Sequence, residues 1–154
     1  MLAHLLAFDT THGRWPYSVH YDGDAMEIDG RRVPCYATTD LDQLPWGEHA
    51  VDLVLECSGR YKQRAQLQGH LDAGARHVLV SYPVDDADAM VVYGVNHGLL
   101  DDSEPIVSNA SCTTNRLAPL VAVLARAFTV RQGVLNTLHT YTNAQRRSEK
   151  APAA

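Results

Sequence analysis

The sequence predicts an α/β protein in which a parallel β-sheet is combined with a small antiparallel β-meander. Four short apolar runs between residues 51 and 108 alternate with one segment of helical spacing and with short loops, a pattern typical of βαβ units. Before them, residues 17–33 show strand-like alternation and contain two Asp-Gly pairs, which favour hairpin turns. The chain has 154 residues, enough for one compact domain with a hydrophobic core.

The first elements follow from turn chemistry. Residues 2–8 read as the end of a helix, which residues 9–13 break. The pairs Asp22-Gly23 and Asp29-Gly30 then mark two turns between strands, because glycine adopts positive φ at little cost. We therefore expect a short antiparallel meander between residues 17 and 33.

The parallel sheet is expected from the next four apolar runs, which span residues 51–57, 77–81, 90–95 and 105–108. Helical spacing covers residues 62–73 and ends at Gly74. The runs are nearly continuous rather than alternating, which predicts a sheet covered on both faces.

The last region opens with Ser111 and continues as a helix, whose apolar residues at helical spacing are Leu117, Leu120, Val121, Leu124 and Phe128. Pro119 lies inside this pattern and is expected to kink the helix or to confine its first turn. Residues 133–141 read as a strand, and the chain turns polar beyond Thr142.

Composition excludes several classes of protein. The net charge is −5 and no Lys/Arg run is long enough to indicate binding to nucleic acid or to an anionic membrane surface. No apolar stretch reaches the length of about 18 residues that a membrane helix needs, and the N-terminus does not resemble a signal peptide. The three cysteines are widely spaced without C-x-x-C, and the eight histidines form no ligand motif. We expect a cytoplasmic protein without disulfides or a metal site.

Cys112 is the candidate nucleophile. It begins the predicted helix, where unpaired N–H groups favour the thiolate over a thiol whose ordinary pKa is about 8.5. His139, from the following predicted strand, is the candidate partner that takes the thiol proton. The same N–H groups, with the hydroxyls of Ser111 and Thr113, could hold an oxyanion or a phosphate.

A purely structural interpretation competes with this one, because a lone cysteine beside an apolar segment is usually an inert buried residue and a lone histidine in a strand is usually structural. Cys35 and Cys57 are interpreted in this structural way. Ser58-Gly59 and Ser81 follow parallel strands, where open α/β sheets bind ligands, although a glycine after a strand is more often just a turn.

The segment Ser108-Asn109-Ala110-Ser111-Cys112-Thr113-Thr114-Asn115, with His139 downstream, resembles the active-site signature of the glyceraldehyde-3-phosphate dehydrogenase family, which includes erythrose-4-phosphate dehydrogenase. Four flanking segments resemble the same family in the same order, and the resemblance extends to about Gln145. These segments are Phe8–Arg14, Val51–Gly59, Ala73-Gly74-Ala75 and Tyr93–Asn96.

The resemblance implies an incomplete Rossmann-like sheet. Residues 1–110 would form a partial NAD-binding domain that lacks its first βαβ unit, and residues 111–154 the first helix and strand of a truncated α+β catalytic domain. Ser58, Gly59 and Ser81 would lie along NAD. A homo-oligomer is possible, as in the family.

The resemblance also implies the chemistry. Cys112 would attack a small aldehyde phosphate to give a thiohemiacetal, and hydride transfer to NAD would leave a thioester. His139 would act as the base. Ser111 and Thr113 would contact the attacking phosphate or the substrate, and Thr142 would contact a substrate phosphate.

Three departures from the family pattern keep alternatives open. The sequence has no G-x-G-x-x-G turn, Thr39 stands where the family usually has an arginine, and Arg116 replaces a residue that is often cysteine or apolar. The alternative to a dehydrogenase is therefore a truncated, non-catalytic family fragment without independent activity. A cysteine hydrolase that uses Cys112 and His139 ranks last, because no Asn/Asp orienting residue is identifiable. The substrate stays open between glyceraldehyde 3-phosphate and erythrose 4-phosphate.

Overall fold

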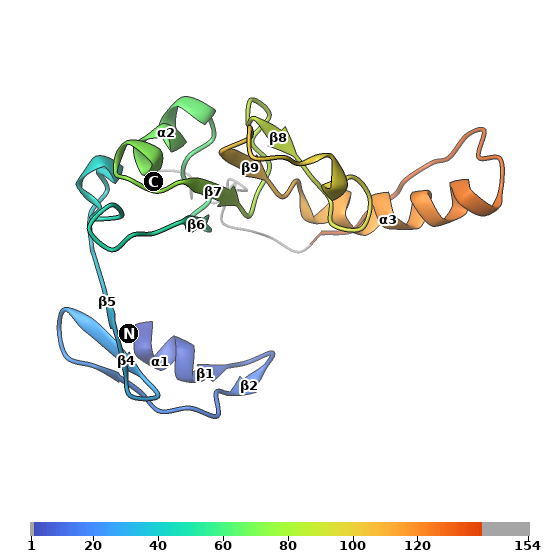
Figure 1. The fold of residues 1–154 in the computed structure, drawn as a ribbon. Helices are drawn as coiled ribbons and strands as arrows, with labels where there is room; N and C mark the ends of the chain where they lie inside the picture. The colour runs from blue at the N-terminus through green and yellow to red at the C-terminus, as the bar shows by residue number, and fades with distance from the viewer. Residues whose placement is uncertain (1, 140–154) are drawn as a thin grey trace, which may run out of the picture.

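The computed structural model describes residues 2–139 of the chain (Figure 1). Its strands form a two-stranded sheet of β1 and β2, a three-stranded sheet in the order β3-β4-β5, and a four-stranded sheet in the order β6-β7-β9-β8. The first two sheets are antiparallel and the third is parallel throughout. The predicted α/β class, with a parallel sheet and a separate antiparallel meander, is therefore confirmed.

The N-terminal segment forms helix α1 (Leu2–Ala7) and a hairpin of β1 (Phe8–Asp9) and β2 (Gly13–Arg14). Within the turn, the Oδ1 atom of Asp9 accepts hydrogen bonds from the backbone N–H groups of Thr11 and His12, at 2.8 and 2.6 Å. These hydrogen bonds stabilise the turn between β1 and β2. The helix itself ends at Ala7, just before the break that the sequence predicts at residues 9–13.

The meander consists of β3 (Val19–Tyr21), β4 (Ala25–Ile28) and β5 (Arg31–Pro34). Asp29 and Gly30 connect β4 to β5 with φ angles of 49° and 77°. Positive φ at both central residues is the backbone of a type I′ turn, which matches the twist of the flanking strands. The Asp-Gly pair at this position therefore sets the register of the hairpin.

The parallel sheet contains β6 (Leu53–Glu56), β7 (His77–Val80), β9 (Ile106–Ser108) and the two-residue edge strand β8 (Ala89–Met90). Helix α2 (Arg64–Asp72) connects β6 to β7, and two short 3₁₀ helices occupy Leu41–Gln43 and His97–Leu99. Glu56 pairs with Val80, so β6 and β7 end at the same level.

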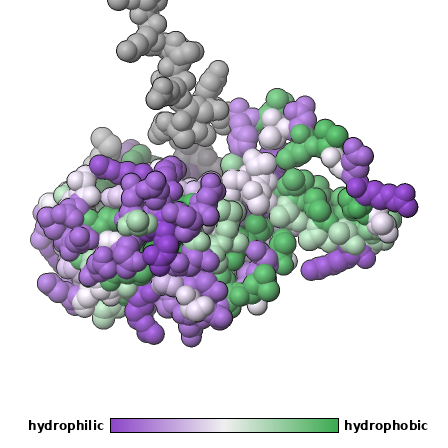
Figure 2. All heavy atoms as spheres, turned by 90° about the horizontal axis from the view of Figure 1, so that it is seen from above, coloured by the Kyte–Doolittle hydropathy of each residue, from purple (hydrophilic) through white to green (hydrophobic). Residues whose placement is uncertain are grey.

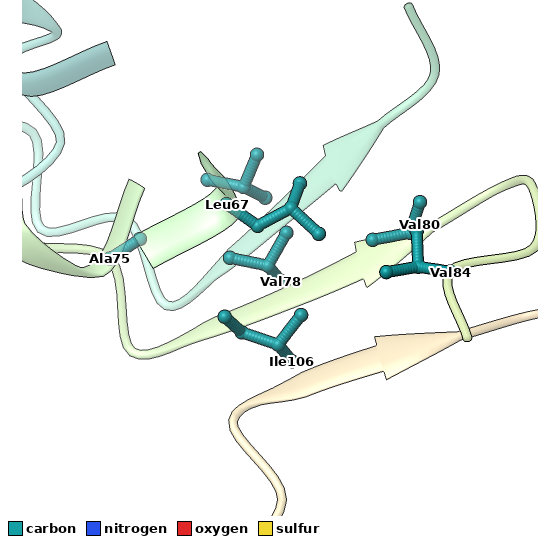
Figure 3. Packing of buried hydrophobic residues seen from close by; sticks show 7 residues of the cluster. Leu67, Ala75, Val78, Val80, Val84 and Ile106 are labelled. Carbon is teal, nitrogen blue, oxygen red and sulfur yellow. The ribbon is translucent and has the colours of Figure 1, made fainter. Parts of the chain in front are cut away.

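The core lies between α2 and one face of this sheet (Figure 3). Leu67 of α2 is fully buried against Val78 and Ile106, which point to the same side from neighbouring strands. The cluster is completed by Val54, Ala75, Val80 and Val84. Alternate strand residues supply the core because successive side chains point to opposite faces of a sheet.

The opposite face of the sheet is not covered in the described part of the chain. Leu53 and Leu55 of β6 are 51% and 63% exposed, and a hollow of about 380 Å³ lies beside Leu79 and Val107 on this face. The prediction of a sheet covered on both faces is therefore wrong for residues 2–139. A continuous apolar run indicates that both faces of a strand are apolar, but it does not indicate what packs against each face.

Two further predictions are corrected. The expected strand at residues 90–95 is confined to Ala89–Met90, because the Asn96 side chain accepts from the N–H of Val92 at 2.7 Å and turns the chain. The expected strand at residues 133–141 does not form over residues 133–139, and residues 140–141 lie outside the described part. Strand-like alternation needs a neighbouring strand for its ladder, and these residues pair with none among those described.

Helix α3 (Cys112–Ala127) extends away from the sheet, and Pro119 lies inside it (Figure 1). The helix runs on from Pro119 to Ala127, so Pro119 is not confined to the first helical turn. Seen from above, hydrophobic residues gather on the side of the molecule where α3 lies, whereas the opposite side is mostly hydrophilic (Figure 2). Among the described residues, no helix is long and apolar enough to cross a membrane.

Candidate active site

Cys112 is the first residue of α3, and its thiol is exposed. Ser111 is the N-cap, and its Oγ atom accepts a hydrogen bond from the backbone N–H of Thr114 at 3.0 Å. The capped end of a 16-residue helix presents the remaining unpaired N–H groups and the positive end of the helix dipole to Cys112. Such a helix end favours a bound anion.

The loop before the helix is held by side chains on both sides. Ser108 is fully buried at the end of β9, where its hydroxyl donates to the carbonyl of Tyr82 at 2.9 Å. Asn115, one turn into α3, donates from Nδ2 to the carbonyls of Asn109 and Ser111, at 2.6 and 3.0 Å.

Between these anchors, Ala110 is buried at a φ of 57°. The left-handed region is unfavourable for alanine and persists only where the surroundings enforce it. The contacts on both sides therefore hold the backbone in a bend at Ala110, and this bend leads directly into Cys112 at the start of α3.

The structure brings His139 to the same helix end, although not to the thiol. Its Nε2 atom lies 2.9 Å from the hydroxyl oxygen of Thr113. Within residues 2–139, no hydrogen bond joins His139 to the Sγ atom of Cys112. The proposed proton transfer between Cys112 and His139 stays a prediction, and Thr142 lies outside the described residues.

Ser58, Gly59 and Ser81 lie together at the carboxyl end of the sheet. Ser81 directly follows β7 and donates its backbone N–H to the carbonyl of Glu56 at 3.0 Å, which ties it to the end of β6. Gly59 has a φ of 70°, and a Cβ atom built on it would meet nothing within 4 Å. The two strand ends thus leave an open backbone edge on which an extended ligand could lie.

These residues fit one part of a dinucleotide. A cavity of about 530 Å³ runs along β6 from Leu53 to Ser58, and of Ser58, Gly59 and Ser81 only Ser58 lines it. The edge and the positive-φ turn at Gly59 fit a ligand that crosses strand ends, whereas the glycine-rich turn that would cradle a pyrophosphate is not in the sequence.

A buried cluster beneath the same edge was not predicted. Glu56 and His70 are 6% and 3% exposed, and their Oε2 and Nε2 atoms lie 3.2 Å apart. Trp46 donates from its indole N–H to the Nδ1 atom of His70 at 3.1 Å. Because an indole nitrogen can only donate, Nδ1 must accept, and the ring proton resides on Nε2 and points at Glu56.

The charge state of this cluster follows from its hydrogen bonds. Burial opposes ionisation of Glu56, but hydrogen bonds from Ser58 and His70 outweigh it and hold the pKa of Glu56 below its ordinary value. Burial, with the carboxylate of Glu56 nearby, raises the pKa of Tyr82 to about 12. A glutamate in an apolar strand was the available sequence signal, because a buried carboxylate requires donors.

No group of three or more His, Cys, Asp or Glu side chains within residues 2–139 is arranged to hold a metal ion.

Comparison with known proteins finds matches to one enzyme family over most of the chain. The family model described as the NAD binding domain of glyceraldehyde 3-phosphate dehydrogenase matches residues 1–64, and the model of the C-terminal domain of the same enzyme matches residues 111–153. The second match begins at the N-cap of α3 and includes Cys112 and His139.

Curated relatives match nearly the whole chain. The plasmid-encoded glyceraldehyde-3-phosphate dehydrogenase of Cupriavidus necator is 47% identical over 144 residues, which is 93% of this chain and 43% of the relative. The enzymes of Pseudomonas aeruginosa and Kitasatospora aureofaciens are 46% and 48% identical, over 96% and 94% of this chain and 44% of each relative. The chain thus spans less than half the length of these relatives. It belongs to the glyceraldehyde 3-phosphate dehydrogenase family.

Proposed function

We propose that this chain carries the nucleophile of an NAD-dependent, phosphorylating aldehyde dehydrogenase, with Cys112 as the attacking group. The observation that carries the proposal is the position of Cys112 at the capped N-terminus of α3, with Ser111, Thr113 and His139 around the same helix end. Family membership supplies the reaction type.

The reaction proceeds through sulfur. His139 takes the proton of the Cys112 thiol, and the thiolate adds to the aldehyde carbon to form a thiohemiacetal oxyanion. Bound NAD would supply the acceptor for the hydride of that carbon, and the product held on Cys112 would be a thioester. Inorganic phosphate then attacks the thioester carbon, so that an acyl phosphate leaves and the thiolate is restored.

The polar groups around the thiol have distinct proposed roles. Ser111 and Thr113 contact the attacking phosphate or the substrate, and Thr142 contacts a substrate phosphate. Exposed N–H groups at the start of α3 favour the negative charge of an oxyanion or phosphate. The contact between Thr113 and His139 supports this arrangement, because it keeps the imidazole beside the helix end.

Ser58, Gly59 and Ser81 are proposed to line NAD where it crosses the ends of β6 and β7. Under this proposal residues 1–110 belong to the cofactor-binding domain and residues 111–154 to the catalytic domain. The substrate is a small aldehyde phosphate, either glyceraldehyde 3-phosphate or erythrose 4-phosphate. The site of action is proposed to be the cytoplasm, and the assembly a homo-oligomer as in the family.

The second candidate is a family fragment that does not turn over substrate alone. Two observations favour it: the sequence has no G-x-G-x-x-G turn, and Leu53 and Leu55 are exposed on the sheet face opposite α2. A chain with these features would retain the activated thiol and lack hydride transfer.

Two measurements separate the candidates. Formation of NADH from each aldehyde phosphate, with phosphate present and with Cys112→Ser as control, supports the dehydrogenase if the wild-type chain alone turns over. Iodoacetamide labelling at neutral pH tests the thiol, with Cys57 as the internal reference. The nucleophile assignment fails if Cys112 reacts no faster than Cys57, and fast labelling without NADH formation supports the second candidate.

A further inference from the structure

An arginine stands one helical turn beyond the candidate nucleophile. Arg116 follows Cys112 by four residues and Thr113 by three within α3. Residues at these spacings share one side of a helix, with Cβ atoms about 5–6 Å apart. The guanidinium group of Arg116 is therefore attached to the same side of the helix as the thiol.

Arg116 also lines a small cavity of about 170 Å³ between α3 and the segment that returns along it. The cavity has a polar part and an apolar part. It is lined by Thr113, Arg116, Leu117, Leu120, Leu135 and Thr137. The hydrogen bond between Thr113 and His139 holds the returning segment against the helix at the end of the cavity nearest Cys112.

No carboxylate balances this positive charge along the helix or the returning segment. Between Glu104 and Glu149 the sequence has no Asp or Glu and contains five arginines, although the whole chain carries a net charge of −5. Within residues 2–139, Arg116 forms no ion pair, whereas Arg32, Arg64 and Arg76 each pair with an aspartate. Among the described residues, no carboxylate therefore competes with an external anion for Arg116.

We propose that Arg116 is a specificity-determining residue of the Cys112 site, and that its guanidinium group selects electrophiles that carry a negative charge. An arginine binds a phosphate or carboxylate group through paired N–H donors, which an apolar side chain at this position would not offer. The proposal rests on the proposed function, because it takes Cys112 as the nucleophile. It deepens that function by assigning recognition of the substrate's anionic group to Arg116.

The test compares two alkylating reagents of the same size and mechanism that differ in charge. In both, the thiolate sulfur bonds to the CH₂ carbon and iodide leaves, but iodoacetate carries a carboxylate and iodoacetamide is neutral. The rate of each is measured at Cys112 in the full chain, by mass spectrometry that resolves the three cysteines. The quantity of interest is the iodoacetate-to-iodoacetamide rate ratio, at low and at high salt.

We expect Arg116→Leu to lower this ratio at Cys112 by about 3- to 10-fold at low salt, the size expected for one nearby charge in a partly screened site. Arg116→Gln should give the same loss, and Arg116→Lys should retain most of the wild-type ratio. Arg126→Gln is the matched control, because Arg126 lies on the same helix about 21 Å beyond Cys112. The rate ratio at Cys112 should not change in Arg126→Gln, and the rate ratio at Cys57 should not change in any of these variants.

An unchanged ratio in Arg116→Leu and Arg116→Gln would overturn the proposal. An equal slowing of both reagents would also overturn it, because Arg116 would then act on the thiol rather than on the charge of the electrophile. Neither result depends on NADH formation. Failure of anion selection is therefore distinguishable from failure of the proposed dehydrogenase activity.

Discussion

The Nε2 atom of His70 lies 3.2 Å from the Oε2 atom of Glu56, and both side chains are buried between α2 and the end of β6. The backbone N–H of Ser58 also donates to Glu56, at 2.6 Å from its Oε1 atom. One carboxylate thus organises the helix, the strand and the turn that carries Ser58. Buried carboxylates are stable only with such donors, so the pair is a sensitive point of the fold.

We expect Glu56→Gln to lower the free energy of unfolding near neutral pH by about 1–3 kcal/mol, because an amide cannot replace both acceptor oxygens of the carboxylate. The pKa of Glu56 lies below its ordinary value in the folded chain. Ionised Glu56 therefore contributes stability above the ordinary glutamate pKa of about 4.3, and the contribution is lost as pH falls through the lower folded value.

The check is urea unfolding of both proteins across this pH range. Wild type and Glu56→Gln should converge as the pH falls, since the acid sensitivity of all other carboxyl groups is common to both. A difference that stays constant from neutral to acidic pH would contradict the assignment of the stabilisation to the ionised carboxylate.

Trp46→Phe should destabilise the chain by about 1 kcal/mol, because the apolar ring is retained while the hydrogen bond to Nδ1 of His70 is lost. Trp15→Phe is the matched control, since Trp15 is 43% exposed. The measurement is the midpoint of urea unfolding followed by circular dichroism. Equal effects of the two substitutions would argue against the buried hydrogen bond.

Ser111→Ala should cost about 1 kcal/mol through loss of the N-cap, and it should also slow alkylation of Cys112, because the first turn of α3 frays. Ser111→Asn keeps a side-chain acceptor without adding charge, so it should restore most of the stability. Iodoacetamide labelling and thermal unfolding report the two effects separately. Labelling of Cys112 at the wild-type rate in Ser111→Ala would show that the cap does not influence the thiol.

Neighbouring residues of β6 should differ sharply in their tolerance of charge. Val54 is 8% exposed and belongs to the core, whereas Leu55 is 63% exposed on the opposite face. Val54→Lys should unfold the chain, because it places an unpaired charge in the core. Leu55→Lys should change stability by about 0.5 kcal/mol or less and reduce self-association. Sedimentation and urea unfolding check both, and a large loss of stability in Leu55→Lys would show that this face is covered in solution.

Local chemistry made much of the fold predictable. The turn at Asp29-Gly30 requires only the two residues that form it, and the helix start at Ser111 requires only its capping side chain. The apolar runs around Val54 and Val78 were recognised as strands for a similar reason, because strand character is visible within a few residues.

The errors concern partners that are distant in sequence. Residues 133–139 have strand-like alternation, but a strand forms only beside another strand. The contact of Glu56 with His70 depends on how α2 packs over β6. The sequence around either residue therefore does not predict the other as its partner. The cavity beside Arg116 likewise depends on the path of the returning segment, which the alternation of residues 133–139 misrepresents.

The hydrogen bonds at the strand ends have a mechanical consequence. Asn109 donates its backbone N–H to the carbonyl of Val80 at 2.8 Å, and Ser81 donates to the carbonyl of Glu56. The segment that precedes Cys112 is thus hydrogen-bonded to β7, the strand that ends just before Ser81. Backbone hydrogen bonds therefore fix the distance between the thiol and the sheet edge when the sheet forms, before any ligand binds.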